Sequence, residues 1–197
     1  MDEDTGIDLY QKRYLDYHKI RRHLSDEPPP NYDAHEQRVC LKIMKGRRSQ
    51  RVFNGDALTT NEIARLLLAI QLAPSSCNRR AVYGRMVGTE DEKNTLSALL
   101  VGGAGWIHTA DVIMLLLADM AAYKSPAEVS YMPYLDAGFI AQNALLMAES
   151  LGIGACFVNP NIREENRPAF DAGFSEGNKF CGAIALGHYD KREVRKD

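Results

Sequence analysis

The sequence predicts an α+β fold, with one globular domain behind an N-terminal helical extension. First, 197 residues, of which 45% are hydrophobic, suffice for one packed core without disulfides or metals. Second, helical and strand patterns are mixed without the regular alternation of a doubly wound sheet. Third, the uninterrupted apolar run from Val112 to Ala118 indicates a strand buried on both faces. We divide the chain into an extension, residues 1–45, and a domain, residues 46–197.

The extension is predicted to contain an amphipathic helix followed by a stiff linker. Four residues between positions 7 and 24 fall on one helical stripe: Tyr10, Tyr14, Tyr17 and Leu24. Three prolines at positions 28–30 end the helix, because proline lacks an N–H and restricts the residue before it. The stripe could dock on its own fold, on a second subunit or on another protein.

Two helices are expected on either side of the boundary between the extension and the domain. A helix over residues 32–45 is ended by Gly46. Thr59, three residues before Glu62, predicts the capped start of a second helix that ends at Pro74. Its buried face would comprise Ile63, Leu66, Leu67, Ile70 and Leu72.

Seven more elements complete the expected domain. Strands are predicted over residues 82–88, 111–118, 155–158 and 180–186, and helices over 90–100, 134–151 and 163–172. The helix over 134–151 is almost uncharged, so we expect it inside the domain or between subunits.

Composition limits the partners and the location. The net charge of -2 gives no overall attraction to nucleic acid or to an anionic membrane. The acidic N-terminus lacks the apolar core of a secretory signal, so we expect a cytoplasmic protein. The four cysteines form no C-x-x-C pair and have no histidine at ligand spacing, so no metal site is expected.

A basic cluster follows the expected helix over residues 32–45. Arg47, Arg48, Ser49 and Arg51 place three guanidinium groups and a hydroxyl within five residues. Arginine presents a fork of donors that matches phosphate oxygens, and serine adds a short donor. The cluster predicts an anion site, with a solvated surface, or an ion pair from Arg51 to Asp56, as the alternatives.

Six motifs occur in a fixed order. They are Arg-Arg-Ser-x-Arg-x-Phe from Arg47, Ala-Pro-Ser-Ser-x-Asn from Ala73, a buried strand after Trp106, Asp-x-Gly-x-x-x-Gln-Asn from Asp136, Leu-Gly-x-Gly from Leu151, and Ala-Leu-Gly-His from Ala185. Together they resemble the nitroreductase family of FMN-dependent oxidoreductases, over residues 46–189. The resemblance implies a mixed, mostly antiparallel sheet flanked by helices, in an intertwined homodimer with flavin at the subunit interface.

The resemblance also implies an activity. NADH or NADPH would reduce FMN, and hydride would pass through flavin N5, in ping-pong fashion, to an electron-poor acceptor such as a nitroaromatic or a quinone. No side chain need act as a catalytic acid or base. Residues 120–132 lie where relatives vary their substrate cover, so we expect acceptor specificity there.

Family likeness assigns roles to the motif residues. Arg47 would meet the FMN phosphate, Arg48 and Ser49 the phosphate and ribityl chain, and Arg51 the pyrimidine edge, where it tunes the ring. The loop that reaches the flavin, often from the opposite subunit, would comprise Pro74, Ser75, Ser76 and Asn78. The strand end facing N5 would be Val158 and Asn159, and the basic tail would add Lys191 or Arg195, with Arg192 and Lys196 as further candidates.

The chain departs from the family where relatives continue the loop with a Gln-Pro-Trp-like sequence. Here Arg79 and Arg80 follow, and their charge could hold an acidic substrate, a dinucleotide phosphate or the FMN phosphate. Simpler interpretations stay open, a helix stop at Pro74 and a turn at Asn159. Two other functions also stay open, a specialised biosynthetic flavin enzyme (a dehydrogenase or reductive dehalogenase) and a non-catalytic flavin-binding or partner-binding protein.

Overall fold

The structure is a computed structural model that describes residues 31–123, 129–175 and 177–190. The chain divides into two compact units, Met1–Val39 and Cys40–Asp197. Helix α2 (Ala34–Gly46) spans this boundary, close to the helix that the sequence predicts there. The expected helix of the extension and the basic tail with Lys191 and Arg195 lie outside the described residues.

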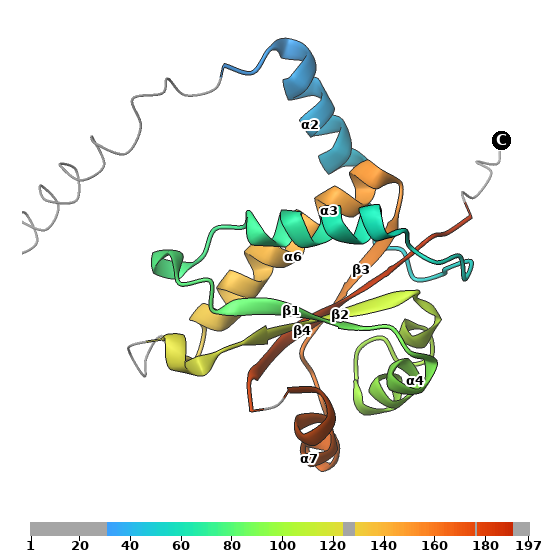
Figure 1. The fold of residues 1–197 in the computed structure, drawn as a ribbon, viewed down its shortest axis with the longest axis vertical. Helices are drawn as coiled ribbons and strands as arrows, with labels where there is room; N and C mark the ends of the chain where they lie inside the picture. The colour runs from blue at the N-terminus through green and yellow to red at the C-terminus, as the bar shows by residue number, and fades with distance from the viewer. Residues whose placement is uncertain (1–30, 124–128, 176, 191–197) are drawn as a thin grey trace, which may run out of the picture. The chain divides into compact units, whose positions relative to one another are not determined.

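Four strands form one antiparallel sheet in the order β1-β2-β4-β3 (Figure 1). The strands are β1 (Val82–Val87), β2 (Val112–Ala118), β3 (Gly154–Val158) and β4 (Lys179–Gly187). Every residue of β2 is buried, as the apolar run predicts, because β2 lies inside the sheet and both of its faces are covered. The α+β prediction is confirmed.

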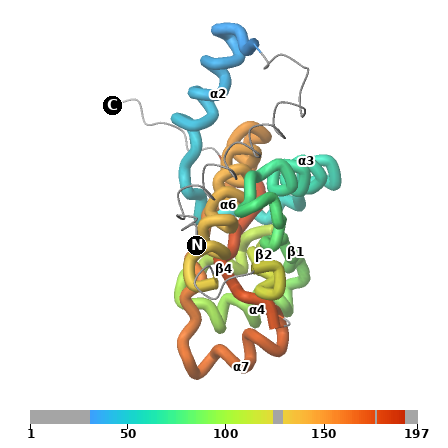
Figure 2. The backbone as a smooth tube through the Cα atoms, turned by 90° about the vertical axis from the view of Figure 1, so that its left-hand side faces the viewer, coloured from blue at the N-terminus to red at the C-terminus, as the bar shows by residue number. Residues whose placement is uncertain are grey.

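Helices cover both faces of the sheet. Helices α3 (Thr60–Gln71) and α6 (Met132–Leu151) lie on one face, and α4 (Glu90–Leu99) and α7 (Arg167–Phe170) lie on the other (Figures 1 and 2). Each face encloses a buried apolar cluster, one with Leu66 and Ile140, the other with Leu96 and Phe170. No helix in the described part of the chain is long and apolar enough to cross a bilayer.

Helix α3 begins as the sequence predicts. The Thr59 side chain accepts the Glu62 N–H, and the Glu62 side chain accepts the Thr59 N–H, so the capping box is complete. Leu66 and Ile70 are buried, but the expectation for Leu72 is wrong. Leu72 keeps helical backbone angles and its N–H donates to the Leu68 carbonyl oxygen, so it lies one turn after Leu68 on the exposed face, where Leu68 is 53% and Leu72 71% exposed.

Helix α6 buries one face and exposes the other. Ile140, Ala144 and Ala148 pack toward the sheet, whereas Leu135 and Phe139 are 51% and 47% exposed. The low charge of α6 therefore reflects an exposed apolar face as well as the face that is buried in the core.

The expected helix over 163–172 is divided into three short turns. A 3-10 turn (Glu164–Asn166) precedes α7, and a π turn (Asp171–Ser175) follows it. Phe170 and Phe174 are both buried, with ring centroids 5.7 Å apart, and the wider π turn accompanies the burial of both rings.

Candidate functional site

The basic cluster lies along the free edge of β3. Ser49 forms a parallel bridge with Ala155, and the Gln50 N–H donates to the Ala155 carbonyl oxygen at 3.0 Å. A Cβ at Gly154 would lie 2.9 Å from Gln50 Cγ, closer than real Cβ contacts allow. Glycine at position 154 therefore lets the cluster approach the sheet.

The three arginines of the cluster have different surroundings. Arg48 Nη1 donates to the carbonyl oxygens of Lys45 (2.7 Å) and Arg47 (2.9 Å), so its guanidinium turns back on the end of α2. Arg47 is half-buried and carries no such bond within the described residues. Arg47 and Ser49 are thus better placed than Arg48 to offer free donors to an anion.

Arg51 lies over an aromatic ring. Its guanidinium carbon is 5.9 Å from the centroid of Trp106, a cation–π distance. Asp56, the alternative partner, instead accepts from the Asn54 side chain at 2.9 Å. The exposed Arg51 is thus oriented by Trp106 and keeps its donors available.

A glycine-rich loop packs on the end of β3. The Val101 N–H donates to the Asn161 carbonyl oxygen at 3.0 Å, and a Cβ at Gly102 would lie 2.8 Å from Val158 Cγ1. The Asn159 side chain accepts the Asn161 N–H at 3.2 Å, so the turn considered at Asn159 in the sequence does form. The same loop leads to Trp106. The motifs did not predict that this loop contributes to the site, although its clustered glycines were a signal.

The Pro74–Arg80 loop has an unusual backbone. Cys77, Asn78 and Arg80 have φ values of 52°, 53° and 52°, a left-handed conformation that is rare outside glycine. The Ser75 side chain accepts the Arg80 N–H at 2.9 Å, and the Ser76 N–H donates to Asp136 Oδ1 at 2.8 Å. The loop is therefore held in a strained form by named contacts, which a simple helix stop would not need.

Asp136 is the centre of a buried polar network. Its carboxylate is 1% exposed and also accepts from the Tyr123 hydroxyl at 3.0 Å. Burial, and then the bond to Asp136, raise the pKa of Tyr123 well above its ordinary value. The guanidinium carbon of Arg79 lies 5.8 Å from the Tyr123 ring centroid. Asp136 and Glu149 are the only charged residues of α6, and this rarity was the available signal for the network.

The cluster and the loop lie at opposite ends of α6. Glu149 lies against Gly46, next to the cluster, whereas Asp136 holds the loop. Between Asp136 and Glu149 the helix rises about 20 Å. One protomer therefore does not bring Ser75, Ser76 and Asn78 beside Arg47 and Ser49.

The model of the nitroreductase family matches residues 85–188, more than half of the chain. The chain belongs to the nitroreductase family. This match begins after the basic cluster and the Pro74–Arg80 loop, so the roles of both rest on their own geometry.

The chain is similar to two curated proteins. A protein of Archaeoglobus fulgidus, provisionally named NADH dehydrogenase/NAD(P)H nitroreductase, is 28% identical over 151 residues, which are 76% of this chain and 84% of that protein. The FMN reductase [NAD(P)H] of Bacillus subtilis is 29% identical over 128 residues, 58% of this chain. The chain spans only 51% of that protein's length.

A solved structure shows the same nitroreductase fold. It is that of a provisionally assigned nitroreductase from Desulfovibrio desulfuricans in complex with FMN, with a TM-score of 0.64 and 24% identity. The match covers 84% of this chain and 94% of that chain.

No group of three metal-ligating side chains occurs among the residues that the structure describes.

Proposed function

We propose that the chain is an FMN-dependent oxidoreductase that takes electrons from NADH or NADPH. The observation that carries the proposal is the position of the basic cluster. Ser49 and Gln50 pair with Ala155 on the edge of β3 in a nitroreductase fold, and Arg47 and Arg51 flank them in the sequence. The Bacillus subtilis relative is named an FMN reductase, which supports the same cofactor.

The donors present fit FMN in their chemistry. Arg47 and Ser49 offer a guanidinium fork and a hydroxyl to the phosphate, and Arg48 contributes its charge from the end of α2. Lys191 or Arg195 would add a further cation from the tail. The glycines at 102 and 154 keep the approach to β3 free of side chains. When bound, FMN supplies reversible hydride chemistry at its N5 atom.

The chain's own residues would orient the flavin and stabilise its reduced form. Arg51, fixed over Trp106, places a positive charge where negative charge on a reduced pyrimidine edge would be stabilised. Val158 and Asn159, packed against Gly102, would form a wall that excludes water from one side. We assign no catalytic acid or base among the side chains.

We propose that a second copy completes the site. Because α6 separates the cluster from the loop, Pro74, Ser75, Ser76 and Asn78 would reach the flavin bound by the other subunit. An apolar groove of about 260 Å³, lined by Ile43, Met44, Leu72 and Met147, adjoins the exposed face of α6 and gives a surface for a homodimer.

The extent of the cofactor-binding unit is part of the proposal. We place it in residues 46–197 and treat residues 1–45 as an extension that supports assembly. All four cysteines are free thiols, which agrees with the reducing cytoplasm that we propose as its location.

The acceptor is proposed to be a small electron-poor molecule such as a nitroaromatic or a quinone. Steady-state oxidation of NADH and NADPH with menadione and with nitrofurazone tests this directly. Turnover with either acceptor that depends on added FMN supports the proposal. FMN that binds tightly without turnover would favour the non-catalytic alternative, and turnover restricted to a biosynthetic substrate would favour the specialised one.

A further inference from the structure

The two arginines that depart from the family pattern, Arg79 and Arg80, have different surroundings. Arg79 lies over the Tyr123 ring, whose hydroxyl donates to Asp136, so its charge is close to the buried carboxylate. Arg80, the next residue, lines a cavity bounded by α3, β1 and α6. The charge of Arg79 is thus accounted for inside the fold, whereas that of Arg80 is not.

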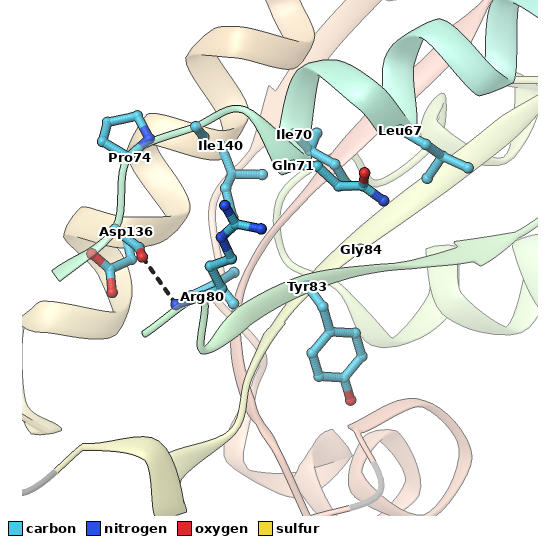
Figure 3. Close-up of a pocket in the computed structure, with 12 residues that line it drawn as sticks. Leu67, Ile70, Gln71, Pro74, Arg80, Tyr83, Gly84, Asp136 and Ile140 are labelled. Atoms are coloured by element: carbon cyan, nitrogen blue, oxygen red, sulfur yellow. Dashed lines mark hydrogen bonds between the residues drawn. The ribbon is translucent and has the colours of Figure 1, made fainter. Parts of the chain in front are cut away.

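The backbone conformation of Arg80 directs its side chain toward the cavity. Its φ of 52° is left-handed, and its N–H donates to Ser75 Oγ at 2.9 Å. Figure 3 shows the side chain entering the space between Gln71 and Ile140, with the bond to Ser75 drawn as a dashed line. A left-handed arginine is disfavoured unless its surroundings stabilise it, and such strain is concentrated at ligand sites.

The cavity combines apolar walls with one cation. Its volume is about 270 Å³, and Leu67, Ile70, Val82 and Ile140 form apolar walls. Its polar groups include the Gln71 amide and the Arg80 guanidinium. Within the described residues, no carboxylate is paired with that guanidinium.

Asp136 also lines the cavity, but its oxygens are engaged. One accepts the Ser76 N–H at 2.8 Å and the other the Tyr123 hydroxyl at 3.0 Å. Its negative charge nevertheless penalises a ligand with two negative charges more than one with a single charge.

We propose that this cavity binds a small monocarboxylate whose apolar body is about the size of one ring. A cavity of about 150 Å³ already accommodates benzene, so this one has room for a ring and a carboxylate. The guanidinium fork of Arg80 matches a carboxylate in two parallel hydrogen bonds, and the apolar walls match the ring. Pro74 and Ser75, proposed above to reach the flavin of a second subunit, also line this cavity, but the test below measures ligand binding and not turnover, so its outcome is separate from that of the proposed flavin chemistry.

The test is calorimetric titration of the purified full-length protein with benzoate. The uncharged benzamide is the matched ligand, and inorganic phosphate and adenosine 2′-monophosphate are the doubly charged ones. We expect saturable benzoate binding at one site per chain, with benzamide at least tenfold weaker and both phosphates weaker still. Absence of saturable benzoate binding, or tighter binding of either phosphate, would overturn the proposal.

Substitutions locate the site. Asparagine tolerates left-handed φ, so Arg80→Asn removes the cation while keeping the backbone, and we expect at least tenfold weaker benzoate binding. Arg65→Gln removes an equal charge from an exposed position of α3 outside the cavity lining, and its affinity should equal that of the unmodified protein. If Arg80→Asn does not fold, Arg80→Gly, which relieves the strain, replaces it. Benzoate affinity unchanged in the folded variant would contradict the assignment.

Discussion

The backbone N–H of Ser76 donates to the buried carboxylate of Asp136 at 2.8 Å and so connects the loop after α3 to the first turns of α6. The two residues are 60 positions apart in the sequence. The carboxylate that makes this connection is also the acceptor for Tyr123, so one side chain positions two segments.

Replacing this carboxylate should destabilise the protein. Asp136→Ala leaves the Ser76 N–H and the Tyr123 hydroxyl without their acceptor, and we expect a loss of about 2–3 kcal/mol in the free energy of unfolding. Urea denaturation measures the loss. Tyr123→Phe removes only one donor and should cost less, about 1 kcal/mol. Equal stability of Asp136→Ala and the unmodified protein would show that the connection contributes nothing.

Arg51 should influence the flavin more than the assembly. Arg51→Ala removes the cation over Trp106, and we expect FMN affinity to fall about tenfold, the lower range for a hydrogen bond to a charged group, while the oligomeric state is unchanged. Trp106 is the single tryptophan of the chain, so quenching of its emission during FMN titration reports binding.

Arg51→Lys is the matched control. It keeps the charge and should retain most of the affinity. Arg51→Ala with unchanged affinity and unchanged rate of flavin reduction would remove the proposed role of this residue.

The exposed face of α6 should mediate dimerisation. Phe139 is 47% exposed, and Phe139→Glu places a charge on the apolar face, so we expect monomers in light scattering coupled to chromatography. Val101→Glu introduces the same charge at a site that is 48% exposed, outside this face, and should leave dimers intact. Dimers that persist in Phe139→Glu would place the interface elsewhere.

Stability should decline in alkaline solution. Burial raises the pKa of Cys181 from the ordinary 9.0 to about 12, so above pH 9 the unfolded chain loses this proton while the folded chain keeps it. Stability from this thiol is complete below pH 9 and is lost as the pH rises toward 12. Between pH 8 and pH 10 this thiol accounts for a loss of up to about 1.4 kcal/mol in the free energy of unfolding. Cys181→Ala should abolish that part of the alkaline loss.

The alkaline control uses an exposed cysteine. Cys40→Ala should lose as much stability between these two pH values as the unmodified protein, because Cys40 is exposed. A Cys181→Ala variant with the full alkaline loss would show that the burial of this thiol is not its cause.

The sequence predicted well those features that depend on residues close together in the chain. The capping box of Thr59 and Glu62 lies within one helical turn, and the apolar run of β2 needs no partner to be recognised. The family motifs likewise predicted the nitroreductase family, whose model matches residues 85–188.

Contacts between distant segments were beyond reach. The Ser76–Asp136 bond and the position of Arg51 over Trp106 depend on how helices and strands pack. Leu72 is apolar, but it follows Leu68 by four residues and lies with it on the exposed face of the helix, and residue type alone does not report which face an apolar residue takes.

The most direct test of the proposed function is the visible absorption spectrum of the purified protein, recorded under anaerobic conditions before and after NADH or NADPH is added. We predict one bound FMN per chain, with an absorption band that bleaches on addition of the reductant. A colourless protein that also fails to bind added FMN would contradict the account and would mean that Arg47 and Ser49 serve another anion.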